Sequence, residues 1–225
     1  MHSDLRILYE DNHLLAVDKP PGVVTQGAAP GDDSLFEAAR TSIKERYQKP
    51  GNVYLGVVSR LDKPVTGVVL FARTSKAARR LSQQFRERSV HKTYWALISS
   101  GLAQPAGTLE HWLLSDPDRP GTRVVKPQTP GAKLARLSYR RLVQLGSAWL
   151  VEIELETGRK HQIRAQFAAS GQPILGDTRY GSRASAPAGI GLHARQLIVE
   201  HPVRQEPVEI TAAVPSWWQQ LGVRD

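Results

Sequence analysis

Two short apolar runs separated by a charged connection constrain the fold of this chain more than any other feature. Residues 53–58 and 67–72 are rich in Val, Leu and Phe, a composition typical of buried strands. Between them, Asp62 is flanked by Arg60 and Lys63, and a proline and a glycine restrict the backbone. We therefore expect a carboxylate held in one place between cations, as a nucleophile or general base requires. A hairpin turn charged only for solubility is the alternative.

Composition narrows the classes of function. The chain has 225 residues, of which 40% are hydrophobic and 23% charged, so it is globular in composition, and one large domain or two small ones are both possible. No linker is long enough to force a domain boundary, and we expect a single domain over 1–225. Its net charge of +9 favours a polyanionic partner, because neutralising phosphates releases counterions. A positive surface kept for solubility is the alternative. No apolar run is long enough to span a bilayer and the first residues are polar, so we expect a cytoplasmic protein with no membrane partner.

Residue types also limit the chemistry. The chain has no Cys, which excludes disulfides, thiolate zinc sites and a Cys nucleophile. The histidines lack the spacing of metal ligands, and no Gly-rich phosphate loop is present. We therefore expect no metal and no cofactor.

Local patterns predict helices and strands along most of the chain. They are a β-hairpin over 5–17, helices over 34–47 and from 75 onward, strands over 90–98, 148–156 and 208–212, a short basic strand over 123–126, and a C-terminal helix with Trp217 and Trp218. Ser34 is expected to cap the first of these helices and Thr74 or Ser75 the second, which has an apolar stripe and a basic flank. Trp217 and Trp218 are expected to pack against the protein rather than to stack on bases. Residues 100–131 are otherwise the least regular part, with loops at 116–121 and 128–131, and another loop is expected at 27–33.

A further helix, ended by Gly171, is predicted to begin at Arg159. Its first turn then contains Arg159, Lys160 and His161, where the helix dipole favours anions rather than cations. Such a cluster is stabilised by a phosphate or by a carboxylate from elsewhere in the fold. A solvated basic helix start is the alternative.

Three other side chains are candidates for the site. Arg164, one turn into that helix, is expected to face inward toward a partner such as Asp62. Lys19 belongs to a rigid Pro-Gly loop over 18–22 and is a candidate for ligand contact, with a solvated loop lysine as the alternative. Tyr94 offers a hydroxyl and an aromatic face, although half-buried strand tyrosines are common.

Several motifs follow one another in order over nearly the whole chain. They are residues 7–22 ending in Asp-Lys-Pro-Pro-Gly, Ser-Arg-Leu-Asp at 59–62 with Thr-Gly at 66–67, Lys-Thr-Tyr-Trp-Ala at 92–96, Leu-Glu-Thr-Gly-Arg-Lys-His-Gln-Ile-Arg at 155–164, Gly-Asp at 176–177, Tyr-Gly at 180–181, Leu-His-Ala at 192–194 and His-Pro at 201–202. This series resembles the motifs of the RluA-type RNA pseudouridine synthases. One such motif is weak evidence, but the ordered set is specific.

The resemblance implies an α+β pseudouridine synthase fold, with a long, mostly antiparallel mixed sheet, flanking helices and a central active-site cleft. It implies that Asp62 is the catalytic aspartate, that Tyr94 lies against the flipped uracil and that Arg164 pairs with the aspartate. Arg60 is expected to contact RNA beside the flipped nucleotide, and Ile163 to line the base pocket. Lys19 and the cluster Arg159, Lys160 and His161 complete the expected substrate-binding set. The family uses no cofactor, and some relatives carry a small N-terminal RNA-binding domain that is not expected here.

The implied reaction isomerises a uridine of structured rRNA or tRNA to pseudouridine, and we expect the protein to act as a monomer. Asp62 attacks the sugar, attacks the base or removes a proton; the sequence leaves these routes open. Ser59, Val65 and Gln166 depart from the family pattern, which affects substrate preference more than activity. Ser59 and Val65 motivate the alternative of an inactive RNA-binding or ribosome-associated protein with the same fold, whereas the presence of Asp62, Tyr94 and Arg164 argues against it. A third class is an N-glycosidase that uses Asp62 as nucleophile and releases free uracil.

Overall fold

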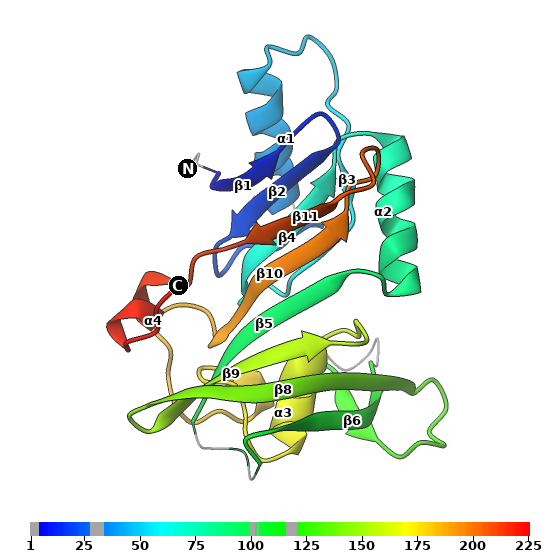
Figure 1. Ribbon diagram of the computed structural model, residues 1–225. Coiled ribbons are helices and arrows are strands. Elements are labelled where there is room, and N and C mark those ends of the chain that lie inside the picture. Colours follow the sequence, from blue (N-terminus) through cyan, green and yellow to red (C-terminus); the bar gives the residue numbers. More distant parts are fainter. Residues whose placement is uncertain (1–4, 28–33, 100–101, 103, 116–120) are drawn as a thin grey trace. The chain divides into compact units, whose positions relative to one another are not determined.

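The computed structural model describes residues 5–27, 34–99, 102, 104–115 and 121–225 (Figure 1). The chain divides into two compact units: unit 1 comprises Met1–Lys92 and Ala194–Ala213, and unit 2 comprises Thr93–His193 and Val214–Asp225. A single catalytic domain over 1–225 stays a prediction. The predicted loops at 27–33 and 116–121 lie, except for their end residues 27 and 121, outside the described residues.

Unit 1 is built on a sheet with a helix against each face. Its hydrogen-bonded order is β1–β2–β4–β10, with β11 on β10 and β3 on β4, and all pairs with an assigned register are antiparallel. The elements are β1 (Ile7–Glu10), β2 (Leu14–Lys19), α1 (Leu35–Arg46), β3 (Gly56–Val57), β4 (Thr66–Ala72), α2 (Ser75–Glu87), β10 (Leu192–Glu200) and β11 (Pro207–Thr211). The first two residues of β10 belong to unit 2.

The inner strands are apolar throughout because their successive side chains face apolar clusters on alternate faces of the sheet. In β2, Leu15 and Val17 face the cluster that includes α1, whereas Leu14 and Ala16 face the cluster that includes α2. Strand β4 divides its side chains in the same way and is fully buried. A strand covered on both faces needs a continuous apolar run, which is the pattern read in the sequence at 67–72.

Both helices of unit 1 begin at the predicted caps. The Ser34 hydroxyl accepts a hydrogen bond from the amide of Glu37 at 3.2 Å, and the Thr74 hydroxyl accepts one from Ala77 at 3.2 Å. Each hydroxyl satisfies an amide that has no partner within the helix. The helix predicted over 34–47 is confirmed as α1, and the one from residue 75 as α2.

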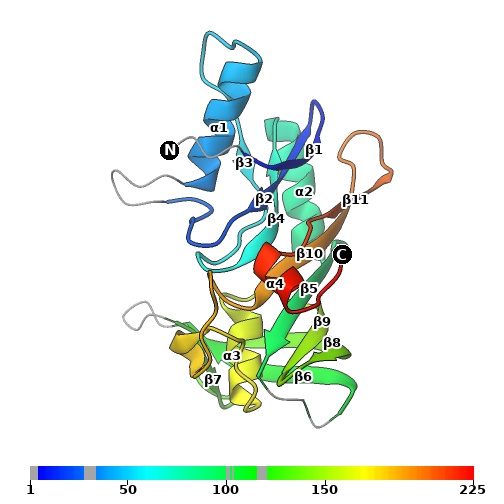
Figure 2. The same cartoon turned by 90° about the vertical axis from the view of Figure 1, so that its left-hand side faces the viewer.

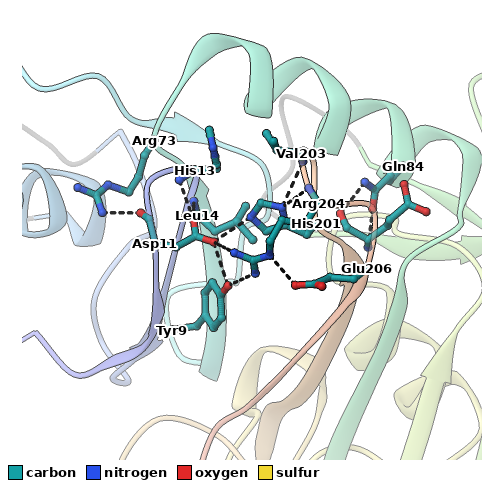
Figure 3. Close-up of polar contacts among 11 residues, drawn as sticks. Tyr9, Asp11, His13, Leu14, Arg73, Gln84, His201, Val203, Arg204 and Glu206 are labelled. Carbon is teal, nitrogen blue, oxygen red and sulfur yellow. Dashed lines mark hydrogen bonds and ion pairs between the residues drawn. The ribbon is translucent and has the colours of Figure 1, made fainter.

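A polar network centred on Asp11 joins the two chain segments that make up unit 1 (Figure 3). One oxygen of Asp11 accepts hydrogen bonds from the amides of His13 and Leu14, at 2.7 and 2.8 Å, and so closes the β1–β2 turn. Its other oxygen accepts from Nε2 of His201 at 2.8 Å and from the Tyr9 hydroxyl at 2.9 Å. Although burial raises the pKa of Asp11, these hydrogen bonds outweigh it and bring the pKa down to about 2.

His201 owes its orientation to the turn between β10 and β11. Its Nδ1 accepts hydrogen bonds from the amides of Val203 and Arg204, at 3.2 and 2.9 Å, so Nε2 is the nitrogen that donates to Asp11. The His-Pro motif thus fastens this hairpin to the β1–β2 turn.

The strands of unit 2 are hydrogen-bonded in the order β5–β9–β8–β6–β7, and all of these pairs are antiparallel. Its elements are β5 (His91–Ile98), β6 (Ala106–Leu114), β7 (Arg123–Val125), β8 (Lys133–Leu145), β9 (Ala148–Leu155), α3 (Gln162–Ala169), the 3₁₀ turn η1 (Thr178–Tyr180) and α4 (Ser216–Gln220). The first two residues of β5 belong to unit 1. Helix α3 packs against β6 and β7 (Figure 2). Trp217 and Trp218 of α4 pack against Leu97 and Leu150, which confirms a packing role.

Several expectations about the elements were incomplete. Residues 100–131 contain β6, a nine-residue strand, because pairing with β8 orders a segment that Pro and Gly flank on both sides. Within 53–58, only Gly56 and Val57 pair with β4. The α+β class and the predominance of antiparallel pairing are confirmed, and the active-site cleft stays a prediction.

Candidate functional site

The loop that carries Asp62 is tied to strand β4 at its start and is closed by a turn at its end. The Ser59 hydroxyl accepts a hydrogen bond from the Leu70 amide at 2.8 Å, and the Val65 amide donates to the Asp62 carbonyl at 3.0 Å, closing the turn. Gly67 has φ +108, and a Cβ there would lie 2.3 Å from the carbonyl oxygen of Ala194. Only glycine permits this backbone conformation together with so close an approach.

The loop is also fastened from the segment that follows β2. The Thr25 hydroxyl donates to the Leu61 carbonyl at 3.0 Å and accepts from the Leu61 amide at 3.1 Å. The Gly22 amide donates to the Lys63 carbonyl at 2.9 Å. The residues on both sides of Asp62 therefore have fixed backbones, and the half-buried Asp62 side chain projects from a constrained position.

Lys19 provides a third attachment, and the expectation of a solvated loop lysine is wrong. Its side chain is fully buried, and its ammonium donates to the carbonyls of Pro20, Val23 and Lys63 at 2.8, 2.8 and 3.1 Å. Burial lowers the pKa of Lys19 to about 8, and the negative charges of Asp62 and Asp18 act in the opposite direction. The ammonium uses all three of its donors on the backbone while its charge acts on Asp62.

The two cations beside Asp62 differ from Lys19. Arg60 and Lys63 are both exposed at the surface of the loop. Asp62 thus lies between one buried cation that fixes the backbone and two exposed ones that are able to meet a polyanion.

In unit 2, Arg164 forms a buried ion pair with Asp177. Its Nε donates to one carboxylate oxygen at 2.7 Å and its Nη2 to the other at 2.8 Å, and the two side chains are only 5% and 1% exposed. The guanidinium also lies over the Tyr180 ring, 5.0 Å from its centroid. The partnership of Arg164 with Asp62 stays a prediction.

Tyr180 links this ion pair to His161. The Tyr180 hydroxyl accepts a hydrogen bond from the Thr122 amide at 2.9 Å and forms a second hydrogen bond with Nδ1 of His161, 2.8 Å away. His161, Tyr180, Arg164 and Asp177 thus form one connected polar group.

The predicted helix start at Arg159 is wrong, because α3 begins at Gln162. His161 adopts a left-handed conformation with φ 51, which ends the preceding turn. The buried side chain of Gln162 accepts hydrogen bonds from the Thr157 hydroxyl at 2.8 Å and the Arg159 amide at 3.0 Å. Arg159 and Lys160 therefore precede the helix and do not lie in its first turn.

The remaining predicted site residues of unit 2 lie on β5, on α3 and in the segment just before α3. Tyr94 is half-buried on β5, opposite Ile153 of β9. Ile163 is buried in the first turn of α3. Arg159 is partly exposed, with its Nε donating to the Leu134 carbonyl at 3.1 Å, and Lys160 is exposed.

The three departures from the family pattern occupy structural positions. Ser59 ties the Asp62 loop to β4, as described above, and Val65 is 2% exposed. Gln166 is fully buried, and its amide nitrogen donates to the carbonyls of Leu109 and Ala135 at 2.9 and 3.2 Å. Each of the three therefore has a role within its own unit.

Sequence reasoning missed several residues that this geometry includes. Thr25 gave no signal, because an isolated threonine after a Pro-Gly loop has no distinctive pattern. Asp177 and Tyr180 lay within quoted motifs, Gly-Asp and Tyr-Gly, yet no role was assigned to them. Gly176 also has a role there, since it has φ +80 and a Cβ would lie 2.6 Å from that of Ala186.

Two properties of the described residues bear on the class of protein. None of their His, Asp and Glu side chains gather in groups of three that are able to hold a metal ion. None of the helices they form is long and apolar enough to cross a membrane.

Known proteins are similar to this chain in sequence and in fold. Residues 13–169 match the model of the RNA pseudouridylate synthase family. An uncharacterized RNA pseudouridine synthase of Synechocystis is 33% identical, covering 97% of this chain and 68% of that protein. Ribosomal large subunit pseudouridine synthase D of Xanthomonas campestris is 35% identical, covering 96% and 68%, and tRNA pseudouridine synthase C of Haemophilus ducreyi is 30% identical, covering 97% and 94%.

A solved structure agrees with this assignment. Human RNA pseudouridylate synthase domain containing 4 matches with a TM-score of 0.80 and 25% identity, covering 96% of this chain and 91% of that one. The predicted pseudouridine synthase fold is thereby confirmed. The chain belongs to the RluA-type family of RNA pseudouridine synthases, isomerases that act on uridines within RNA.

Proposed function

We propose that this enzyme isomerises a specific uridine of a structured rRNA or tRNA and that Asp62 is its catalytic carboxylate. The observation that carries the proposal is the fixed loop around Asp62. Thr25 fastens Leu61, and Lys19 and Gly22 fasten Lys63, so the backbone on both sides of the carboxylate is held. Such preorganisation is what a group needs to act on one atom of a bound substrate.

The reaction explains why the carboxylate needs to remain charged. Pseudouridine formation breaks the bond between N1 of uracil and C1′ of the ribose, turns the base and joins C5 to C1′. No atom is gained or lost and no electron is transferred overall. An ionised Asp62 is able to act as nucleophile or as base.

Other residues are proposed for binding and for the base. Tyr94, which contacts the uracil after it has left its stack, and Arg164 complete the catalytic set with Asp62, and Ile163 lines the base pocket. Exposed Arg60 contacts the RNA beside the flipped nucleotide, since phosphates are the usual partners of such cations. Arg159, Lys160 and His161 belong to the same substrate-binding set.

Lys19 is reassigned by its contacts. It was expected to bind substrate, but its three donors are used on backbone carbonyls of its own unit. We propose that Lys19 is a positioning residue that acts through the Asp62 loop.

The relatives support RNA as the substrate. Their names specify the ribosomal large subunit for some and tRNA for another. For this chain we propose one of these two classes, which places the enzyme in the cytoplasm, and we expect it to act as a monomer.

The test uses unmodified transcripts of large-subunit rRNA and of tRNAs. Each is incubated with the wild-type protein, with Asp62→Asn and with Asp18→Asn, and pseudouridine is detected by carbodiimide labelling. Asp18 is the matched control because it is another partly buried carboxylate that acts on Lys19. We expect conversion at a defined uridine by the wild type and by Asp18→Asn, and none by Asp62→Asn, which still binds RNA.

Two results contradict this proposal. Absence of pseudouridine from every transcript treated with the wild type, or release of free uracil, removes the isomerase assignment. Residual conversion by Asp62→Asn, with reversion to Asp excluded by mass spectrometry, removes Asp62 as the catalytic group.

A further inference from the structure

The outer face of helix α2 carries a row of exposed cations. Lys76, Arg79 and Arg86 lie three and seven residues apart, a spacing that places them on one side of the helix. The opposite side holds Ala77 and Leu81, which are buried in the core of unit 1. At 1.5 Å per residue, the row is about 15 Å long.

These cations are not neutralised by ion pairs among the described residues. Within the part of the chain that the structure describes, Lys76, Arg79 and Arg86 form no ion pair. The one acidic side chain of α2, Glu87, accepts a hydrogen bond from Gln83 at 2.8 Å. Other arginines of unit 1 do have acidic partners: Arg6, Arg40, Arg46, Arg73 and Arg204.

The end of α2 adds a second, independent observation. Arg88 caps the helix in the left-handed conformation, with φ 61, where glycine is the usual residue. Its charge acts on Lys92 of β5, whose pKa is lowered chiefly by burial and further by Arg88. Arg88 therefore adds a positive charge next to Lys92, and a non-glycine residue retained in a strained conformation is typical of functional positions.

The chemistry of this surface identifies its partner. Interfaces with proteins usually have an apolar or aromatic centre. The large hydrophobic side chains exposed among the described residues are Tyr47, Tyr54, Leu134, Val143, Val203 and Leu221, and none of them belongs to α2. An extended row of cations without an apolar centre fits a phosphodiester backbone, which Lys and Arg bind independently of sequence.

We propose that Lys76, Arg79, Arg86, Arg88 and Lys92, the α2 basic face, bind the RNA backbone away from the target uridine. The identity of the polyanion as substrate RNA rests on the proposed function. The face supplies affinity and orientation, whereas the residues around Asp62 act on the base.

The test compares two triple variants that each remove three positive charges. The first is Lys76→Gln with Arg79→Gln and Arg86→Gln on the α2 basic face. The matched control is Arg40→Gln with Lys44→Gln and Lys49→Gln, exposed cations on or just after α1, against the other face of the same sheet. Dissociation constants for an unmodified large-subunit rRNA transcript and for a tRNA transcript are measured over a series of KCl concentrations.

We expect the salt dependence to separate the variants. Each phosphate contact contributes a slope of about −0.7 in the log–log plot for single strands. The α2 variant should therefore lose about 2 from the wild-type slope, whereas the α1 variant keeps it. Equal slopes for the two variants overturn the proposal, as does an α2 variant that loses affinity for polyglutamate but not for RNA.

Arg88→Gly provides a second measurement that does not depend on the triple variant. Glycine accepts the left-handed conformation without strain, so the melting temperature should rise while RNA affinity falls. A rise in melting temperature with unchanged affinity would overturn the role of Arg88. Because these are binding measurements, they remain informative if the wild type forms no pseudouridine, a result that refutes the proposed function alone.

Discussion

Asp177 holds the guanidinium of Arg164 by two hydrogen bonds, from Nε at 2.7 Å and from Nη2 at 2.8 Å, in a site that solvent scarcely reaches. The two residues are separated by 13 positions, and η1 places the carboxylate beside α3. A planar guanidinium is suited to this geometry and an ammonium is not. The orientation of Arg164 is therefore fixed from within unit 2.

The first prediction follows from that pair. Asp177→Asn leaves Arg164 with a neutral neighbour in a buried site and should lower the free energy of unfolding by about 3–5 kcal/mol. Arg164→Lys should also lose most of the turnover, although its charge is retained. Urea denaturation and pseudouridine formation are measured on the same preparations.

The control is Arg140→Gln, which breaks an exposed ion pair with Glu152 and should leave the urea midpoint nearly unchanged. Near-wild-type turnover of Arg164→Lys would show that two-point pairing is not required.

The second prediction concerns the pH dependence that Lys19 produces. Its pKa is about 8 in the folded protein, whereas an exposed lysine has 10.5. Between these values the unfolded chain binds more protons, so the contribution of Lys19 to stability rises with pH. Turnover should change in the opposite direction and fall above about pH 8, because a neutral amine no longer holds the Asp62 loop with three donors and a charge.

Lys19→Met separates these effects. The variant should have a lower kcat than the wild type and should lack the fall in turnover above about pH 8, with little change in RNA affinity. If turnover falls over the same pH range in the variant and the wild type, the titration belongs to another group. Urea denaturation at pH 7 and pH 10 supplies the corresponding difference in stability.

Sequence reasoning succeeded where the pattern that determines a feature is local in the sequence. Helices α1 and α2 were predicted with their caps because a capping side chain and the amide it accepts from are three residues apart. The alternation of β9 and the apolar run of β4 are likewise local patterns. Asp62 was identified as a constrained carboxylate because the proline and glycine that restrict its loop are its neighbours in sequence.

What the sequence did not reveal depends on contacts between distant segments. Lys19 has the local pattern of a solvated loop residue, and its burial depends on the carbonyl of Lys63, 44 positions away. The role of Thr25 depends on Leu61, 36 positions away. The start of α3 was misplaced because Arg159 and Lys160 suit a helix interior, whereas the left-handed backbone of His161 ends the turn before it.

The third prediction is a loss of stability in acid that is specific to Asp11. Its pKa of about 2 lies below the ordinary value of 3.8, so the contribution of Asp11 is complete above about pH 4 and is lost as the pH falls to about 2. After allowance for screening by solvent, that contribution is about 1–2 kcal/mol. Asp11→Asn should therefore be less stable than the wild type at pH 6 and equally stable near pH 2.

The control is Glu206→Gln, which removes the charge of an exposed partner of Arg204. A constant difference between Asp11→Asn and the wild type at both pH values would mean that Asp11 acts through something other than its charge.

The last prediction tests whether the fixed loop matters for the chemical step. Thr25→Val preserves the shape of a buried side chain but leaves the amide and carbonyl of Leu61 without the hydroxyl that bonds to both. We expect a loss of about 1–3 kcal/mol in stability and a clear fall in kcat, because the backbone next to Asp62 is released. The KM for RNA should change little, since the hydroxyl is directed at the protein backbone. Thr25→Ser restores the hydroxyl without the methyl group and should recover most of kcat. If Thr25→Ser is as impaired as Thr25→Val, the methyl packing of Thr25 rather than its two hydrogen bonds positions the loop.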